Sequence, residues 1–446
     1  MNKRIVILGA GESGIGAALL AKQKGFDVFV SDEMQIKEPY KNELILNKIN
    51  FEEDRDNDEK ILNADEIVKS PGIPETQEII KKIRAAGISI ISEIELAYRF
   101  KNESKIIAIS GSNGKSTTTA MIYHICKTAG LSCALVGNIG YSFARQVAED
   151  PKKVYVAEIS SFQLDDIIEF KPDIAVLTNI TEDHLDRYEY NFENYIKSKF
   201  SITKNQTEKE VFIYCLDDEI TVKYLNKFLI RSKLLPYTMH KPLPQGAYIL
   251  NSEMHLKLEN EEIIMNVEDF AIKGKHNQYN TMAAGLAAFI MDIRKEKIRV
   301  AVQTFTSLEH RMEPVATIRG VEFINDSKAT NVNSTWYALE SMTKPVILIL
   351  GGIDKGNDYS FIKDLVKEKV KAIVCMGVDN RKIHEAFGNQ VELIVNTNNA
   401  KDAVQSAFHF ADKGDVVLLS PACASFDLFK NYEDRGKQFK AAVKEL

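Results

Sequence analysis

The sequence predicts an α/β fold of three domains, each built on a mostly parallel, doubly wound sheet. Short apolar segments alternate with helical sequence along most of the chain, which is the pattern of parallel βα units. Glycine-rich turns follow three of these segments, at residues 9–14, 111–114 and 351–356. A chain of 446 residues is also too long for one hydrophobic core. We therefore predict Rossmann-like domains over residues 1–102 and 305–446, with a P-loop ATPase-like domain over residues 103–304.

The composition is typical of a globular protein and excludes several classes of function. Hydrophobic residues make up 45% and charged residues 27% of the chain, which suffices for packed cores. The net charge of −6 gives no basic excess and argues against nucleic-acid binding. Five cysteines without metal-finger spacing indicate reduced thiols. The sequence shows no signal peptide and no apolar run of the roughly 18 residues that a membrane span needs. We expect a cytoplasmic protein that acts as a monomer.

The first domain opens with a nucleotide-binding pattern. A predicted strand, Arg4–Leu8, leads into the glycine turn Gly9–Gly14 and an amphipathic helix, and a second strand, Asp27–Ser31, ends at Asp32. This is a G-x-G-x-x-G fingerprint with an acidic residue about twenty positions later, as in dinucleotide-binding proteins. The same geometry suits any diphosphate or nucleotide sugar. An NAD-dependent oxidoreductase is therefore one open alternative.

Further elements complete the first domain. We predict a strand over Glu66–Lys69, a rigid turn over Ser70–Pro74, a helix over Thr76–Ala86 and a strand over Ile88–Ile91. The next segment, Glu93–Phe100, is interpreted as a connection to the central domain.

The central domain opens with a phosphate loop. The apolar strand Ile106–Ile109 is followed by glycines at 111 and 114, and Lys115 then opens a helix. The glycines allow backbone N–H groups and the positive helix end to point at a phosphate. Lys115 adds a charge for the outer phosphates, and the Ser116 hydroxyl is placed for magnesium. Ile109 stands where the usual pattern has its first glycine, so this is a shortened variant.

Polar residues follow the ends of three later strands. These strands are predicted over residues 131–136, 153–157 and 172–177. Asn138, Glu158 and His184 follow them and should meet Lys115 at one edge of the sheet. Glu158 directly follows an apolar strand, which favours a magnesium ligand over a surface carboxylate. For His184, the neighbouring Asp183 favours a cation site over a packing role.

Two helices later in the central domain carry polar residues. The helix predicted over Phe192–Thr203 contains Lys197 and Lys199, whose spacing alone indicates two solvated charges. Asn277 and Asn280 precede a helix predicted over 281–292, where they would cap it or read a base edge.

The third domain repeats the α/β pattern. Strands are predicted over residues 321–324, 346–350, 371–376 and 415–419. The first ends at the polar segment Asn325–Asn331, with a helix beginning near Val332, which is a position for an anionic ligand. Cys423 is interpreted as a small residue in a tight turn and not as a nucleophile.

Eight motifs together resemble a known family. GSNGKST, GNIG, EISSFQL, TNITEDHLDRY, EHRME, INDSKATN, LGGIDKG and SPACASFDLFKNYEDRG occur in this order, and on them the chain resembles the bacterial Mur ligases of peptidoglycan precursor synthesis. DSKATN and SPACAS are specific to the member that adds D-glutamate to UDP-N-acetylmuramoyl-L-alanine. The resemblance implies an ATP-dependent amide-bond ligase that works through an acyl phosphate. Another Mur-type ligase or a folylpolyglutamate ligase is the second open alternative.

The resemblance also implies roles for individual residues. ATP would contact Gly111, Ser112, Asn113, Gly114, Lys115, Ser116, Thr117, Asn277 and Arg311. The UDP substrate would contact Ser13, Gly14, Asp32, Asn138 and His184. D-Glutamate would contact Lys328, Thr330, Lys355, Ser425 and Tyr432, the last standing where phenylalanine is common.

Two magnesium ions are implied as well. Ser116 and Glu158 match the first site, and His184 and Lys199 match the second. Lys199 matches a lysine that is carbamylated in these ligases, contrary to the solvated charge that its spacing indicates. Lys115, Glu158, His184 and Lys199 are thus the implied catalytic residues, and the C-terminal domain would move to close the site.

Overall fold

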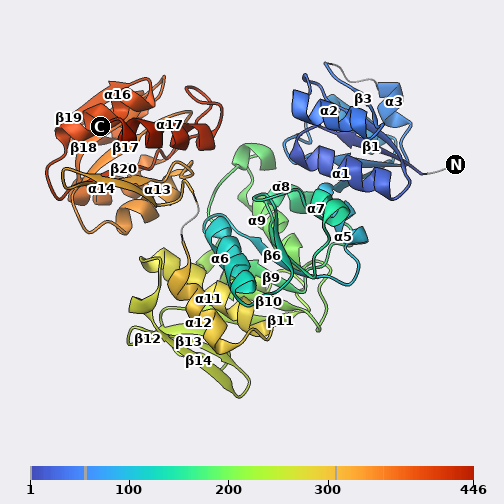
Figure 1. Cartoon of the computed structure of the whole chain (residues 1–446), viewed down its shortest axis with the longest axis horizontal. Helices are drawn as coiled ribbons and strands as arrows, with labels where there is room; N and C mark the ends of the chain where they lie inside the picture. The colour runs from blue at the N-terminus through green and yellow to red at the C-terminus, as the bar shows by residue number, and fades with distance from the viewer. Residues whose placement is uncertain (1–2, 55–57, 307–308, 355) are drawn as a thin grey trace. The chain divides into compact units, whose positions relative to one another are not determined.

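Apolar segments of the chain form the strands of three separate sheets (Figure 1). The structure is a computed structural model and describes residues 3–54, 58–306, 309–354 and 356–446. Within these residues the sheets have five, nine and six strands and are mostly parallel. The predicted α/β fold class is confirmed. Among the described helices, none combines the length and apolar character that crossing a membrane requires.

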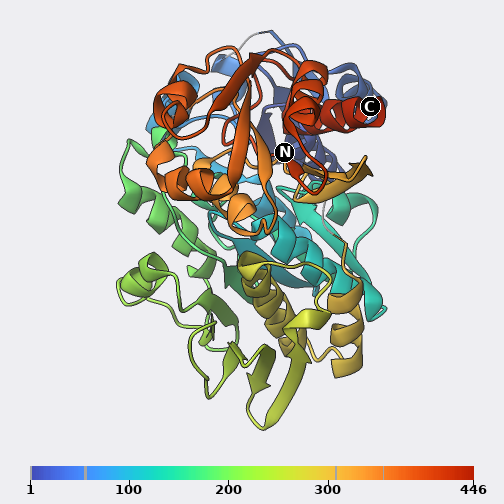
Figure 2. The same cartoon turned by 90° about the vertical axis from the view of Figure 1, so that its left-hand side faces the viewer.

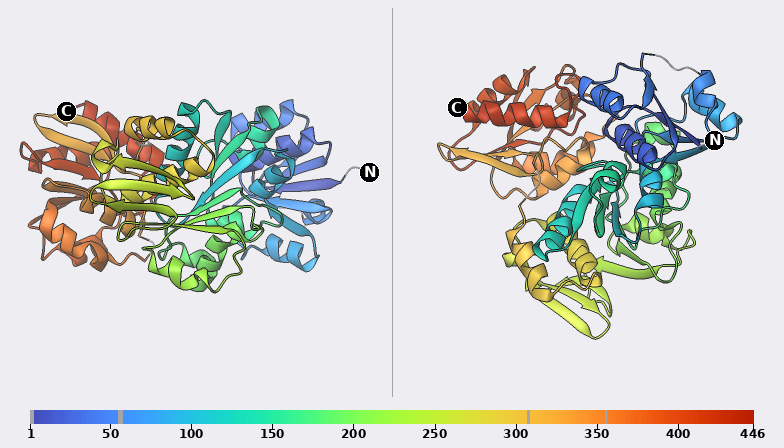
Figure 3. Two further views of the ribbon diagram at one scale, coloured as in Figure 1. Left: turned by 90° about the horizontal axis from the view of Figure 1, so that it is seen from below. Right: turned by 45° about the vertical axis from the view of Figure 1, so that its right-hand side comes forward.

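The first sheet is entirely parallel, in the order β3-β2-β1-β4-β5. Its strands are β1 (Arg4–Leu8), β2 (Asp27–Ser31), β3 (Asn50–Glu52), β4 (Glu66–Lys69) and β5 (Ser89–Ser92). Its helices are α1 (Glu12–Gln23), α2 (Glu38–Leu46), α3 (Asp58–Leu62), α4 (Glu78–Ala85) and α5 (Glu93–Phe100). Alternate residues of β1 belong to two different hydrophobic clusters. Ile5 and Ile7 belong to one cluster, and Val6 and Leu8 belong to the other. Helices therefore cover both faces, as the blue strands in the left view of Figure 3 show.

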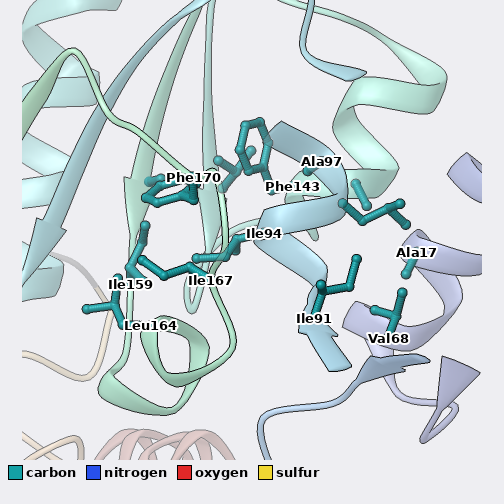
Figure 4. Close-up of a cluster of buried hydrophobic side chains, with 14 of the residues drawn as sticks. Ala17, Val68, Ile91, Ile94, Ala97, Phe143, Ile159, Leu164, Ile167 and Phe170 are labelled. Atoms are coloured by element: carbon teal, nitrogen blue, oxygen red, sulfur yellow. The ribbon is translucent and has the colours of Figure 1, made fainter. Parts of the chain in front are cut away.

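Helix α5 corrects the prediction of a connection over Glu93–Phe100. Ile94 and Ala97 on this helix are fully buried, in a cluster with Val68 of β4 and Phe143 and Phe170 of the following region (Figure 4). Local sequence alone did not predict this helix of eight residues, because its packing partners are distant in the chain.

Two buried carboxylates of α5 bind backbone of the region that follows. Glu95 accepts hydrogen bonds from the N–H groups of Ile168, Glu169 and Phe170 at 2.8–3.0 Å. Glu93 accepts bonds from the Ser142 hydroxyl and the Ala144 N–H, both at 2.6 Å. These contacts tie the first sheet to the central one.

Glu93 makes stability depend on pH. Burial raises the pKa of its carboxyl from 4.5 to about 7, so the folded state binds a proton that the unfolded state releases. Glu93 therefore stabilises the fold at low pH, and this contribution is lost as the pH rises from about 4.5 through 7. We compare the free energy of unfolding of Glu93→Gln with that of the wild type. This difference should rise in favour of the variant by about 2 kcal/mol between pH 5 and pH 8.

Urea unfolding at the two pH values measures this gain. The exposed Glu103→Gln is the control, for which the pH dependence should equal that of the wild type. An identical pH dependence in Glu93→Gln and the wild type would contradict the expectation.

The central sheet has the order β14-β13-β12-β11-β10-β9-β6-β8-β7, and only the pairings of β13 with its neighbours β12 and β14 are antiparallel. Its strands are β6 (Lys105–Ser110), β7 (Cys133–Gly137), β8 (Val154–Glu158), β9 (Ile174–Leu177), β10 (Val211–Cys215), β11 (Lys233–Thr238), β12 (Gly246–Leu250), β13 (Glu253–Leu258) and β14 (Glu261–Asn266). The antiparallel strands form the yellow-green edge at the bottom of Figure 2.

The helices of this region alternate with its parallel strands. They are α6 (Lys115–Thr128), α7 (Phe143–Glu149), α8 (Ser161–Asp165), α9 (Phe192–Phe200), α10 (Glu219–Leu225), α11 (Lys275–Ile290), α12 (Lys295–Thr304) and the 3₁₀ helices η1 (Leu185–Tyr188), η2 (Ser201–Thr203) and η3 (Val267–Asp269). Helix α11 begins six residues earlier than predicted, directly after Gly274, whose φ is +94°. Asn277 and Asn280 therefore lie inside the helix, and Asn280 is not its cap.

The third sheet has the order β15-β16-β20-β17-β18-β19, and only β15 is antiparallel. Its strands are β15 (Glu313–Ile318), β16 (Val321–Asn325), β17 (Val346–Leu350), β18 (Val370–Met376), β19 (Leu393–Thr397) and β20 (Val416–Leu419). Its helices are α13 (Val332–Glu340), η4 (Tyr359–Ile362), α14 (Lys363–Lys369), α15 (Arg381–Phe387), α16 (Ala400–Phe410) and α17 (Tyr432–Lys444).

Contacts divide the chain into two compact units. The first unit contains residues 1–271 and 279–305, and the second contains residues 272–278 and 306–446. The first and central sheets thus belong to one unit.

Candidate active site

The phosphate loop lies between β6 and α6 and requires both of its glycines. Gly111 and Gly114 have φ values of +139° and +81°. A Cβ on Gly111 would lie 1.9 Å from Thr178 Oγ1, and one on Gly114 would lie 2.4 Å from Asn280 Oδ1. Close packing against β9 and α11 therefore excludes any side chain at these two positions.

The end of β9 holds the loop in place. The N–H of Ser112 donates to the Asn179 carbonyl at 2.8 Å, and the N–H of Asn113 donates to Asn179 Oδ1 at 2.9 Å. The Ser112 hydroxyl is buried and donates to the Thr181 carbonyl at 2.9 Å. These bonds fix the backbone that would surround a phosphate.

Two lysines meet at the carbonyl of Gly111. Lys115 Nζ donates to Gly111 O at 2.7 Å and to Ser112 O at 2.8 Å. Lys199 Nζ donates to the same Gly111 O at 2.8 Å from helix α9. Two lysine amino groups thus share one carbonyl oxygen of the loop, and the positive charge of Lys115 favours an anionic ligand close by.

Lys199 is buried, and the prediction of a solvated charge at this position is wrong. Only 2% of its surface is exposed, whereas Lys197 is exposed. Burial lowers the pKa of Lys199 well below 10.5, and the positive charge of Lys115 lowers it further. The sequence did contain a signal, because Lys199 lies four residues after the buried Tyr195 on the apolar face of α9.

Glu158 ends β8 beside this cluster. Its side chain is 1% exposed, and Asn138 Nδ2 donates to Glu158 Oε1 at 2.7 Å. Ser116, at the start of α6, is also fully buried. A buried carboxylate and a hydroxyl beside a phosphate loop form an all-oxygen donor set, which fits a magnesium ion. Of the convergence predicted for Lys115, Asn138, Glu158 and His184, the structure shows the direct contact between Asn138 and Glu158.

His184 lies at the rim of the site and not in its interior. Its side chain is 40% exposed, and its Nε2 lies 3.6 Å from Asp183 Oδ2. Its backbone has a φ of +54°, and its ring faces Phe162 edge-on with a centroid distance of 5.1 Å. The imidazole is therefore accessible to a ligand and is oriented by neighbours on both sides.

A cavity of the first unit lies beside the glycine turn that follows β1. Its volume is about 490 Å³, and its lining includes Ser13, Asp32 and the turn Pro71–Ile73. Asp32 accepts the N–H of Ala10 at 2.6 Å and that of Met34 at 2.9 Å, so this carboxylate holds the glycine turn. A Cβ on Gly14 would lie 1.8 Å from the Gly9 carbonyl, which makes Gly14 a packing requirement of α1.

Other predicted site residues belong to the second unit. Lys328 Nζ lies 5.5 Å from the ring centroid of Tyr432. Ser425, in the segment after β20, is buried. Thr330 is exposed in the turn before α13. Asn277 Nδ2 donates to the Lys273 carbonyl at 2.8 Å. Lys355 lies outside the described residues.

Arg311 has a buried acidic neighbour in this unit. Burial raises the pKa of Asp326 to about 7, and the charge of Arg311 opposes the rise. The predicted nucleotide contact at Arg311 is thus adjacent to the Asp326-Ser327-Lys328 segment.

Comparisons with known proteins agree along the entire chain. The family descriptions Mur ligase MurD-like N-terminal domain, Mur ligase middle domain and Mur ligase glutamate ligase domain match residues 3–92, 109–288 and 310–423. The UDP-N-acetylmuramoylalanine–D-glutamate ligase of Christiangramia forsetii is 52% identical to this chain, with all of both chains covered. Ligases of the same name from Bacteroides fragilis and Salinibacter ruber are 54% and 38% identical, covering at least 98% of each chain. The chain belongs to the UDP-N-acetylmuramoylalanine–D-glutamate ligases.

Solved structures of more distant Mur-type ligases share the fold. A pseudomurein peptide ligase type C from Methanothermus fervidus has a TM-score of 0.64 at 21% identity, with both chains covered completely. A UDP-N-acetylmuramate-alanine ligase from Thermotoga maritima has a TM-score of 0.64 at 16% identity, again over both complete chains. At these identities the likeness concerns the three-sheet α/β fold of the ligase.

One residue that organises the second unit of the ligase was not singled out from the sequence. Arg435 on α17 has no exposed surface, and burial lowers its pKa to about 10. Its guanidinium donates to Ser327 O at 2.8 Å and Cys423 O at 3.1 Å, and to Gly351 O at 3.4 Å. The loops after β16, β17 and β20 thus converge on one side chain. Its position four residues before the buried Phe439 was the available signal.

The steric role of Gly114 leads to a prediction for this ligase. We expect Gly114→Ala to weaken ATP binding at least ~10-fold, because the new Cβ would displace Asn280 and shift the loop. Gly130→Ala at the other end of the same helix is the matched control. Gly130 has a similar φ of +79° but no heavy atom within 4 Å of its Cβ position. Calorimetric titration with ATP should separate the two variants, and equal ATP affinities would contradict the steric argument.

Proposed function

We propose that this ligase joins the amine of D-glutamate to the carboxyl group of UDP-N-acetylmuramoyl-L-alanine at the expense of ATP, in peptidoglycan precursor synthesis. The proposal rests on one observation above all. Lys115, Lys199 and Glu158 are held together at a phosphate loop, in a chain about half identical over its full length to ligases with this name.

The phosphate loop and its helix would bind the nucleotide. Backbone N–H groups near Gly111–Gly114 and the positive end of α6 suit the phosphates of ATP. Lys115 would rotate from its two carbonyl partners to the transferred phosphoryl group, whose charge exceeds that of a carbonyl. Ser116, Glu158, His184 and Lys199 would hold two magnesium ions, which when bound neutralise charge on the phosphoryl oxygens.

Lys199 has the chemistry that carbamylation needs. Its lowered pKa increases the fraction of neutral amine, which attacks CO₂ and loses a proton to give an anionic carbamate. The product places an anionic oxygen ligand beside Glu158, where the unmodified amine has no oxygen to offer. This supports the carbamylated lysine that the family resemblance implies.

The reaction would proceed in two steps. The substrate carboxylate attacks the γ-phosphorus in line and releases ADP, giving an acyl phosphate. The amine of D-glutamate then attacks the acyl carbon, and phosphate leaves after a tetrahedral intermediate. Asn138 and His184 would orient the reacting carboxylate, while Lys328, Thr330, Lys355, Ser425 and Tyr432 would bind D-glutamate, and Asn277 and Arg311 would contact ATP.

The cavity behind Gly9–Gly14 would bind the UDP portion. Ser13, Gly14 and the Asp32-held glycine turn provide backbone N–H groups at the start of α1. In this proposal the ligand of the G-x-G-x-x-G motif is the UDP portion of the substrate and not NAD. The three-domain division at residues 102 and 304, the monomeric state, the cytoplasmic location and the closing movement of the C-terminal domain remain part of the proposal.

Phosphate release from ATP tests the function directly. We expect release by the purified protein only when UDP-N-acetylmuramoyl-L-alanine and D-glutamate are both present, and L-glutamate should not replace the D-isomer. Release with a different amino acid would favour another Mur-type or folylpolyglutamate ligase. Titration with NAD, for which we expect no binding, tests the oxidoreductase alternative.

A further inference from the structure

Arg187 links the cavity of the first unit to the loop that carries His184. It lies on η1, three residues after His184, and its guanidinium reaches the turn that follows β4. Its Nη2 donates to the carbonyls of Pro71 at 3.1 Å and Ile73 at 3.3 Å, and its Nη1 donates to that of Gly72 at 3.2 Å. Three successive carbonyls of one turn thus share one side chain.

The turn that Arg187 holds is a wall of the 490 Å³ cavity. Pro71, Gly72 and Ile73 all line it, together with Gly11 and Ser13 of the glycine turn. Within the turn itself, the N–H of Ile73 donates to the Ser70 carbonyl at 3.1 Å. A ligand that fills the cavity would press on this turn and therefore on Arg187.

The guanidinium of Arg187 also lies against the ring of Phe162 on α8. The Arg187 Cζ lies 4.5 Å from the centroid of the Phe162 ring, a cation–π contact. The edge-on contact of the same ring with His184 has a centroid distance of 5.1 Å. Arg187 and His184 are thus linked through Phe162 as well as through the short chain segment between them.

The chemistry of these contacts indicates positioning and not charge balance. Among the described residues, Arg187 has no carboxylate partner, although the ion pairs of Arg84, Arg99 and Arg145 show that such partners are common in this unit. Its donors are used on neutral carbonyls in a fixed geometry. A planar guanidinium can bond three carbonyls and stack on a ring at once, which an ammonium group cannot do.

We propose that Arg187 is a positioning residue that couples occupancy of the nucleotide cavity to the placement of His184 at the reacting carboxylate. This inference rests on the proposed function. Binding of the UDP portion to the turn would thereby be used to align the loop that carries His184. The His184 loop has strained backbone, with φ near +55° at both His184 and Glu189, so it needs such external support.

Steady-state kinetics of Arg187→Met provide the test. We expect kcat to fall about tenfold, because His184 loses its alignment, while the affinity for UDP alone changes less than about threefold. Arg84→Met is the matched control, since Arg84 Nη2 joins Asp166 at 2.8 Å across the same two sheets without contacting the cavity turn or Phe162. It should keep kcat within about twofold of wild type.

A double-mutant cycle separates positioning from a general structural role. If Arg187 acts through His184, Arg187→Met should lower kcat little further in a His184→Ala background, whereas an independent structural effect would be multiplicative. Arg187→Lys provides a variant that keeps the positive charge, and it should lose as much kcat as Arg187→Met. The proposal would be overturned if the effects of the two substitutions on kcat multiplied in the double mutant. It would also be overturned if Arg187→Lys kept the kcat of the wild type.

Different results would refute the proposed function and this inference. Absence of D-glutamate-dependent phosphate release in the wild-type protein would refute the function. Normal release by the wild type together with an unchanged kcat in Arg187→Met would refute only the role of Arg187.

Discussion

Replacement of Lys199 with methionine is expected to lower turnover at least ~10³-fold and to leave the stability of the ligase unchanged or slightly higher. Activity falls because a ligand of the proposed second magnesium site is lost. Stability is retained because the buried ammonium, with its strongly lowered pKa, is replaced by an apolar side chain of similar length. The Gly111 carbonyl also keeps a donor, since Lys115 Nζ lies 2.7 Å from it.

Turnover and thermal unfolding of the same samples measure these two effects. Lys197→Met, on the exposed face of the same helix, is the control and should behave as wild type in both assays. If Lys199→Met kept more than about a tenth of wild-type turnover, the assignment of Lys199 to the catalytic site would be wrong.

Carbon dioxide distinguishes a carbamate from an unmodified amine at Lys199. Wild-type activity should fall in buffer freed of CO₂ and return when bicarbonate is added, whereas Lys199→Met should not respond. Activity that is independent of CO₂ would contradict the carbamate while leaving the position of Lys199 in the site unchanged.

Local sequence predicted the strands well because their signals are local. Arg4–Leu8, Asp27–Ser31 and Glu66–Lys69 coincide with β1, β2 and β4 to the residue. Each is a short run of apolar residues that ends at a glycine, acidic or serine-proline turn. The glycine loop at Gly111–Gly114 was predictable for the same reason, since its chemistry resides in consecutive residues.

The environment of charged residues was less predictable, because it depends on distant parts of the chain. Lys199 bonds to a carbonyl 88 residues earlier, and Arg435 bonds to one 108 residues earlier. Helix α5 likewise obtains its apolar contacts from Phe143 and Phe170. Helical spacing relative to Tyr195 and Phe439 could have placed Lys199 and Arg435 on apolar faces, but spacing alone does not reveal whether a buried polar partner is present for the charge.

Replacement of Arg435 with methionine is expected to destabilise the second unit by about 3 kcal/mol or more. The guanidinium is fully buried and donates to the carbonyls of Ser327, Gly351 and Cys423, and its Nε donates to the Ser327 hydroxyl at 3.0 Å. Methionine fills much of the volume but leaves these buried acceptors without their donor. Each such loss costs roughly 1–3 kcal/mol.

Calorimetry of the whole protein should show this loss as a lower unfolding temperature of the second unit only. Arg381→Met is the control, because Arg381 lies in the same unit but its side chain is 84% exposed in an ion pair with Asp379, and it should shift the transition by less than about 1 °C. An equal effect of the two substitutions would show that burial of Arg435 contributes nothing to stability.

Arg435→Lys tests whether the same side chain also shapes the amino-acid site. Lysine retains the charge but lacks the planar fork that reaches three loops at once, so Ser327 and the adjacent Lys328 should lose their fixed position. We expect KM for D-glutamate to rise at least ~10-fold and KM for UDP-N-acetylmuramoyl-L-alanine, whose proposed site is in the first unit, to stay within about twofold. A parallel rise in both constants would indicate general loosening of the fold. The selective rise is expected because Arg435 joins the loops after β16, β17 and β20, which carry the predicted D-glutamate contacts.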